Sequence, residues 1–121
     1  MIKARVALES TWCTVTIEYW QPANKTLDVK IPKDLHDEKK NLGAAVLVAL
    51  ENKENLQYAK LQDADLQGAK LRGAKLQGAN LRGANLRDAD LQNADLFGAN
   101  LQDAVLSEAN IKYAKDCGAI L

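Results

Sequence analysis

Hydrophobic and polar residues alternate along the first quarter of the chain, and this alternation predicts β-strands. Apolar side chains fall on every second position of the segments 2–8, 13–19 and 27–31. A period of two with β-branched residues is typical of half-buried strands. The stretches 9–11 and 21–25 between them are rich in turn-forming residues. The pattern therefore predicts a three-stranded antiparallel meander with one covered face.

After the third of these segments the pattern becomes helical. Asp34 can cap a first helical turn, and Asn41 can cap the apolar stretch 42–50. Most apolar residues of this stretch fall on one helical face, but Leu47 and Val48 lie off it. We therefore expect a helix over 42–50 that is covered on more than one side and closes the end of the segment that follows.

From residue 56 onward the hydrophobic pattern has a period of five. Leucine stands at every fifth position from 56 to 106, with Ile111 in the next place, and alanine stands at every fifth position from 59 to 119. Five residues advance about 140° around an α-helix, so the leucines of a helix would spiral over every face. In a flat strand, an odd period would place successive leucines on opposite faces. Neither element keeps these side chains together.

A chain that turns a corner once per unit keeps every leucine and alanine inside. Four corners close a square coil of about twenty residues, and successive coils are then spaced by roughly 4.8 Å. The residue two places after each leucine fits this geometry, because Gly, Asn and Asp tolerate tight turns and positive φ. Such residues are Asp63, Gly68, Gly73, Gly78, Gly83, Asp88, Asn93, Gly98 and Asp103.

Units such as Ala64-Asp65-Leu66 and Ala79-Asn80-Leu81 closely resemble the pentapeptide repeat family, whose pattern is Ala-Asp/Asn-Leu-x-x. The resemblance covers residues 55–115 and implies a right-handed quadrilateral β-helix. We therefore expect a β solenoid of about three coils, preceded by a small meander and a capping α-helix. The expected domains are 1–53 and 54–121.

The carboxyl end of the repeat is expected to lack a cap. The next central position after Ile111 is Asp116, which suits a dry interior poorly. Ala119 and Leu121 then return to the register, so one imperfect last face can form. Since the end of a solenoid is an unpaired edge, this end is a candidate surface for a homodimer.

Charge and composition exclude several classes of function. Lys+Arg and Asp+Glu both number 16, so electrostatic capture of bulk nucleic acid is not expected. The chain has no apolar run long enough for a membrane-spanning helix and no signal-peptide pattern. Cys13 and Cys117 form neither a metal motif nor a disulfide framework, which fits a cytoplasmic protein. The expected partner is a protein, with no nucleic acid and no membrane.

Candidates for catalysis and metal binding are few. His36 could bind a metal together with Asp37 or Glu38, but a solvated helix residue is the preferred interpretation. Asp63, Asp65, Asp88 and Asp90 could bind calcium, although hydrogen bonding within the coil explains the Asp and Asn residues that precede the central leucines. Ser10 and Ser107 lack a motif around them, and the glycines are explained as corners. The sequence therefore predicts no catalytic residue, no cofactor, no metal site and no enzyme activity.

Five side chains are candidates for binding a protein. Tyr58 and Phe97 fall on the same face two coils apart, and they could anchor a partner or shield the junctions with the cap and the terminus. Arg72, Arg82 and Arg87 each follow a central leucine directly, and they form either a polar binding stripe or a solvated surface with compensating charges. Trp12 and Trp20 are expected either to pack on the helix or to form an exposed patch.

The sequence thus favours a non-enzymatic protein-interaction or scaffold module, or an oligomerising spacer for the amino-terminal segment. The family resemblance adds an alternative, a DNA mimic that binds a type II topoisomerase. That mechanism needs a long and strongly negative rod. Residues 55–115 carry eight basic and seven acidic residues, and three coils extend only about 14 Å. Both features disfavour the mimic.

Overall fold

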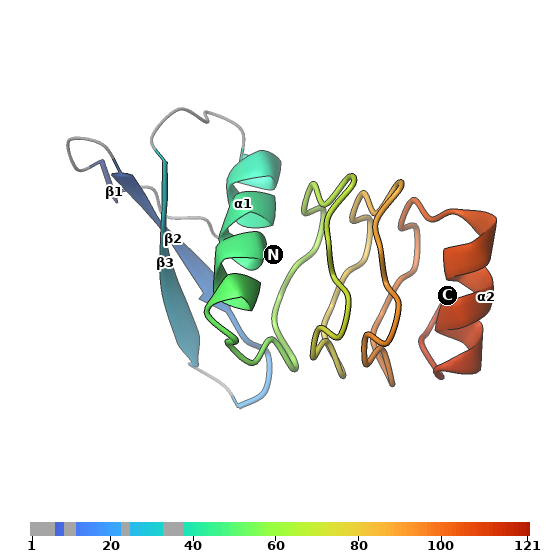
Figure 1. Cartoon of the computed structure of the whole chain (residues 1–121). Helices are drawn as coiled ribbons and strands as arrows, with labels where there is room; N and C mark the ends of the chain where they lie inside the picture. Colours follow the sequence, from blue (N-terminus) through green and yellow to red (C-terminus); the bar gives the residue numbers. More distant parts are fainter. Residues whose placement is uncertain (1–6, 9–11, 23–24, 33–37) are drawn as a thin grey trace.

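A small antiparallel sheet forms one end of the molecule (Figure 1). The computed structural model describes residues 7–8, 12–22, 25–32 and 38–121. The strands β1 (Ala7–Leu8), β2 (Trp12–Glu18) and β3 (Thr26–Pro32) pair in the order β1-β2-β3, with both pairs antiparallel. The predicted meander is therefore confirmed, although residues 2–6 of the first predicted strand lie outside the described residues.

The alternation in the two longer strands separates a buried face from a polar one. Val15, Ile17 and Ile31 are fully buried, whereas on the other face Thr16 donates a hydrogen bond of 2.6 Å to Asp28. The helix α1 (Glu38–Glu51) packs against β2 and β3. It covers the apolar face, as an alternating strand with one dry side requires.

The helix α1 begins earlier than the sequence predicts. Asn41 lies inside the helix, so the prediction that it caps the amino end is wrong. The apolar stretch continues a helix that charged residues have already started, and Asp34 lies outside the described residues. The expected buried face is confirmed for Leu42, Ala45, Val46 and Ala49, which are all at most 1% exposed, whereas Leu50 on the same predicted face is only partly buried.

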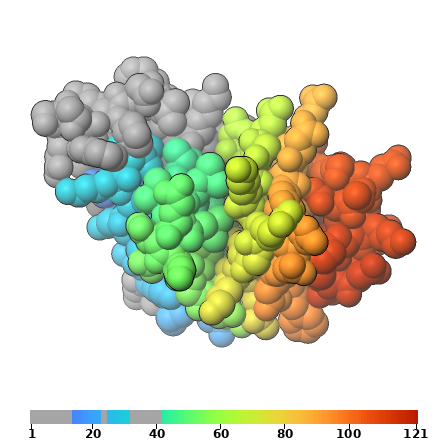
Figure 2. All heavy atoms as spheres, viewed as in Figure 1, coloured from blue at the N-terminus to red at the C-terminus, as the bar shows by residue number. Residues whose placement is uncertain are grey.

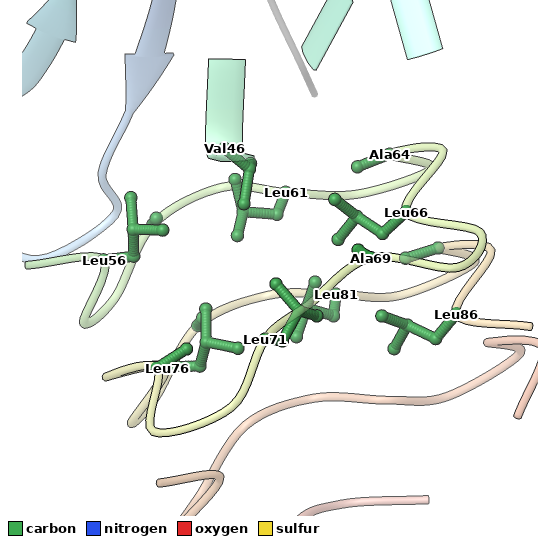
Figure 3. Close-up of a cluster of buried hydrophobic side chains, with 14 of the residues drawn as sticks. Val46, Leu56, Leu61, Ala64, Leu66, Ala69, Leu71, Leu76, Leu81 and Leu86 are labelled. Atoms are coloured by element: carbon green, nitrogen blue, oxygen red, sulfur yellow. The ribbon is translucent and has the colours of Figure 1, made fainter. Parts of the chain in front are cut away.

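The other side of α1 closes the first layer of the repeat. In Figure 3, Val46 of α1 lies directly above Leu61. The backbone of α1 also comes very close to the repeat at Gly43, where a Cβ atom would overlap the carbonyl oxygen of Asp65 and lie 2.9 Å from its carbonyl carbon. The helix is therefore covered on two sides, as predicted, while Leu47 at its edge stays exposed.

The repeats form a β-solenoid in which residues twenty apart lie side by side. Parallel bridges join Lys60 to Asn80, Asn80 to Asn100 and five further pairs with the same spacing between residues 65 and 120. We call twenty consecutive residues of the solenoid a layer, so that bridge partners occupy the same place in neighbouring layers. Backbone hydrogen bonds join the layers, for example from the N–H of Leu81 to the carbonyl of Asn100 at 2.8 Å.

The interior of the solenoid consists of leucine and alanine. Every central leucine from Leu56 to Leu101 is at most 2% exposed, and the alanines from Ala59 to Ala99 are at most 7% exposed. Figure 3 shows leucine side chains of successive units pointing toward one another. Alanine fits beside the corners, because a larger side chain there would overpack the interior.

The sheet and the solenoid share backbone hydrogen bonds at one junction. The end of β2 continues alongside the first layer, where Tyr19 forms an antiparallel bridge with Ala59 and Lys60 donates to the carbonyl of Glu18 at 2.7 Å. The buried hydroxyl of Tyr19 donates to the carbonyl of Asn55 at 2.7 Å. Burial is the main cause that raises the pKa of Tyr19, and the nearby charge of Glu54 adds to it. One hydrophobic cluster runs from the sheet through α1 into the repeats.

A second helix corrects the prediction of a bare carboxyl end. The helix α2 (Glu108–Asp116) lies across the last layer (Figures 1 and 2). Its side chains replace the backbone donors of a further layer, because Asn110 donates to the carbonyl of Ala89 at 2.9 Å and Tyr113 donates to that of Ala94 at 2.8 Å. Ile111 is therefore helical and does not begin another repeat unit.

The chain rejoins the solenoid after α2. Ile120 bridges Asn100, which agrees with the predicted return to the register. The predicted homodimer was based on an uncapped end, and any self-association here has to use the outer surface of α2 or the returning strand. Among the described residues, no helix is long and apolar enough to cross a membrane.

Because of the close contact at Gly43, replacing this glycine by alanine should change stability in the opposite direction from that usual inside a helix. Replacing glycine by alanine inside a helix ordinarily stabilises a protein by about 1 kcal/mol. Overpacking costs about 1–3 kcal/mol, so we expect Gly43→Ala to lower the free energy of unfolding, measured by urea denaturation. Ala44→Gly in the same helix is the control and should show the ordinary loss of helix propensity. A Gly43→Ala variant with a raised melting temperature would contradict the close packing of α1 on the repeat.

Candidate interaction surface

One corner of the solenoid gathers aromatic side chains around a column of glycines. The column consists of Tyr58, Gly78, Gly98 and Gly118, which are twenty residues apart and have φ values of 63°, 67°, 69° and 84°. Phe97 directly precedes Gly98, and Trp20 reaches the same corner from the end of β2. We call these six residues the aromatic corner.

Tyr58 occupies an unusual backbone conformation at the upper end of this corner. A positive φ costs a bulky side chain about 1–2 kcal/mol, and the equivalent positions in the next layers are glycines. The ring of Tyr58 lies over Gly78, where a Cβ atom would overlap it. Trp20 packs edge-on against the same ring, with the ring centroids 5.2 Å apart. Contacts with Trp20 and Gly78 thus hold the tyrosine in its strained conformation.

Trp20 fastens the corner to the second layer. Its indole Nε1–H donates to the carbonyl of Gly78 at 2.8 Å, and its backbone N–H donates to Tyr58 at 3.0 Å. The side chain nevertheless remains 48% exposed. The expected exposure of this tryptophan is therefore confirmed, but its contacts are with the solenoid and not with the helix. The side chain of Trp12 lies outside the described residues.

Phe97 forms the lower end of the corner, and its side chain is more exposed than that of Trp20. Its side chain is 62% exposed, and its ring packs near Gly118, where a Cβ atom would lie 3.0 Å from it. Ile120 lies two residues after Gly118 and is 50% exposed. Between the two ends, the Cβ position of Gly98 has no atom within 4 Å from any residue other than its two chain neighbours. The corner therefore has an apolar group at each end and open space in the middle.

The three candidate arginines do not join this corner. Because residues twenty apart stack, Arg72, Arg82 and Arg87 belong to three different columns and do not form a single stripe. Arg72 pairs with Asp90 at 3.0 Å. Arg82 contacts Asp103 at 3.3 Å. These pairs are the compensating surface charges that the sequence suggested.

Asp90 illustrates how the carboxylates before the leucines are used. Its pKa is lowered mainly because the backbone N–H of Gln92 donates to the carboxylate, and the Arg72 guanidinium adds to this effect against some desolvation. Asn80, Asn85 and Asp95 accept the same kind of bond from the second residue after them. Local hydrogen bonding therefore explains both residue types. Among the described residues, no group of three acidic, His or Cys side chains could hold a metal.

Polar side chains outside the arginine and Asp90 pairs include two with structural roles, Ser107 and Asp63. Ser107 is the N-cap of α2 and accepts a hydrogen bond from the N–H of Asn110 at 3.3 Å. His36 and Asp37 lie outside the described residues. Asp63 lies over Gly83, whose added Cβ would overlap its carboxylate oxygen.

Comparison with known proteins agrees with the repeat pattern. The family model for pentapeptide repeats matches residues 55–88 and 84–121, with eight copies of the repeat. Together these spans cover more than half of the chain. The chain belongs to the pentapeptide repeat family. No curated protein matches the chain, and no solved structure does.

Pentapeptide repeat proteins are generally non-enzymatic scaffold or interaction modules. In this pentapeptide repeat protein, the second matched span includes α2. The helix therefore replaces part of a layer, and the chain keeps the register of the repeat.

The sequence pointed to Tyr58 and Phe97 as binding residues but did not point to Ile120 or to the open position at Gly98. The stacking of residues twenty apart in the structure places Gly98 between the two aromatic side chains and Ile120 next to the last layer of the corner.

The ring over Gly78 predicts unequal effects of alanine at two similar corners. Gly68 and Gly78 have φ values of 68° and 67°, but only Gly78 has a ring at its Cβ position. We expect Gly68→Ala to cost about 1 kcal/mol from the positive φ alone, and Gly78→Ala to cost about 1 kcal/mol more from displacing Tyr58.

Chemical denaturation measures both losses. In a Tyr58→Ala background the difference between the two corners should vanish, which a double-mutant cycle reveals. Equal losses of stability in the wild-type background would show that Tyr58 does not pack on Gly78.

Proposed function

We propose that the protein is a non-enzymatic protein-interaction or scaffold module and that the aromatic corner is its binding surface. In this proposal the solenoid is a right-handed quadrilateral β-helix of about three coils. The bridges between residues twenty apart support the coil length. Residues 1–53 and 54–121 are the proposed domains, of which the first closes the solenoid and supplies Trp20.

The observation that carries this proposal is the exposure of large apolar side chains on one corner. Trp20 and Phe97 of the aromatic corner are 48% and 62% exposed, and Ile120, two residues after Gly118, is 50% exposed. Tyr58 is held in a strained conformation beside Trp20. Trp and Tyr are over-represented among the residues that dominate binding energy at protein interfaces. Strained residues are frequent at binding sites, where the surrounding structure maintains them.

The rigidity of the corner also favours binding. Gly78 donates to the carbonyl of Phe97 at 2.9 Å, and Gly98 donates to that of Gly118 at 3.0 Å. These bonds tie three layers together directly beneath the aromatic side chains. A partner therefore meets a preformed surface and does not have to order the backbone, which lowers the entropic cost of association.

The surface charges speak against the DNA-mimic alternative. A mimic of DNA needs a dense array of unpaired carboxylates, whereas Asp90 and Asp103 are paired with arginines and Glu18 lies 3.8 Å from Lys60. We therefore propose that the partner is a protein that recognises apolar groups. We also propose that the interaction takes place in the cytoplasm.

Site-specific photocrosslinking in cells tests the proposed surface. A photoreactive phenylalanine analogue replaces Phe97 in one variant and Gln92 in another. Both side chains directly follow a central leucine and are exposed, but they lie on different faces. We expect defined protein adducts from position 97 and none of these from position 92. Identical adduct patterns at both positions, or none at position 97, would contradict the aromatic corner as the binding surface.

A further inference from the structure

The two ring positions of the aromatic corner have a spacing that selects a ligand conformation. The ring of Tyr58 occupies the Cβ position of Gly78, and the ring of Phe97 packs at the Cβ position of Gly118. These glycines are two layers apart along the corner. With a layer spacing of about 4.8 Å, the rings are about 9.6 Å apart along the axis.

This spacing matches one turn of a polyproline II helix. Such a helix rises about 3.1 Å per residue, so residues i and i+3 lie on the same side about 9.3 Å apart. Two prolines in these positions can each rest on one ring. The backbone between them crosses Gly98, whose Cβ position has no atom within 4 Å from residues other than its two chain neighbours.

The charge of the corner points to the same kind of ligand. From the second layer downward, the side chains that flank the glycine column are Gln77, Phe97 and Cys117 on one side and Asn80, Asn100 and Ile120 on the other. All are uncharged, so the complementary segment is also uncharged. The side-chain oxygen of Gln77 accepts a hydrogen bond from Gln57 at 3.1 Å. The amide nitrogen of Gln77 can therefore donate to a ligand carbonyl, the group that an extended proline segment leaves exposed.

We infer that the aromatic corner binds an uncharged, extended partner segment with prolines at positions i and i+3. The inference rests on the proposed function, because it names the partner class of the same surface. Exposed aromatic grooves are a general means of recognising the polyproline II conformation, whose low flexibility reduces the entropic cost of binding.

Titration with synthetic peptides, followed by NMR chemical shifts, tests this inference. The probe is a capped, alanine-based peptide with two prolines separated by two alanines. The control peptide has the same composition, but one alanine separates its prolines, so that they fall on different sides of the helix. We expect saturable shifts at Gly98, Phe97 and the Trp20 indole N–H with the first peptide, and affinity weaker by about tenfold with the second.

Matched variants locate the binding site on the protein. Phe97→Gln introduces the residue found at the equivalent positions 57 and 77, and Gly98→Asn introduces the corner residue found at 93, where φ is 62°. Each should weaken binding of the first peptide by about tenfold. Gly68→Asn, at a distant open corner, should not change it. Melting temperatures establish that the variants are folded.

The outcomes separate the inference from the proposed function. Equal affinity for the two peptides, or no loss of affinity in both Phe97→Gln and Gly98→Asn, overturns recognition of the i, i+3 spacing. If no peptide binds but photocrosslinking depends on position 97, the proline inference is wrong and the interaction surface stands. If crosslinking also fails at position 97, both are wrong.

Discussion

The structure depends on stacking identical layers around a core of leucine and alanine. Ten leucines from Leu56 to Leu101 are buried, and burial of each contributes about 1.5–3 kcal/mol. The backbone bonds between layers satisfy the polar groups that burial would otherwise leave without partners. Neither contribution suffices alone, because a single layer can shield neither its leucines nor its hydrogen-bonding groups. The repeat is therefore stable only with neighbours or caps on both sides.

The caps explain how a short solenoid also acquires a distinctive surface. At one end α1 packs so closely that Gly43 has no room for a side chain, and the sheet beside it brings Trp20 to the corner. At the other end α2 satisfies the carbonyls of the last layer through Asn110 and Tyr113. Between these ends, the regular corners place Tyr58 and Phe97 two layers apart on a backbone fixed by interlayer bonds.

Regular features were predictable from the sequence, and irregular ones were not. The five-residue period identified the buried leucines because this packing depends on side-chain spacing alone, and the alternation around Val15 identified the sheet. The helix α2 was missed because Ala109, Ile111 and Ala114 keep the repeat register within a helical segment. The absence of Gly, Asn or Asp two places after Leu106, where Glu108 stands, was the available signal. The candidate site was half predicted, since the two aromatic residues could be assigned to one face but the open position at Gly98 required the stacked backbone.

Amide hydrogen exchange tests the layered structure most directly. The N–H groups of Leu76, Leu81 and Leu86 donate between layers to the carbonyls of Asp95, Asn100 and Val105. The N–H groups of Arg82 and Arg87 instead donate to nearby exposed asparagine side chains. We predict that the leucine amides exchange only through global unfolding, and that the arginine amides exchange much faster through local opening. Leucine amides that exchange as fast as those of the arginines would contradict the stacking of layers on which the account rests.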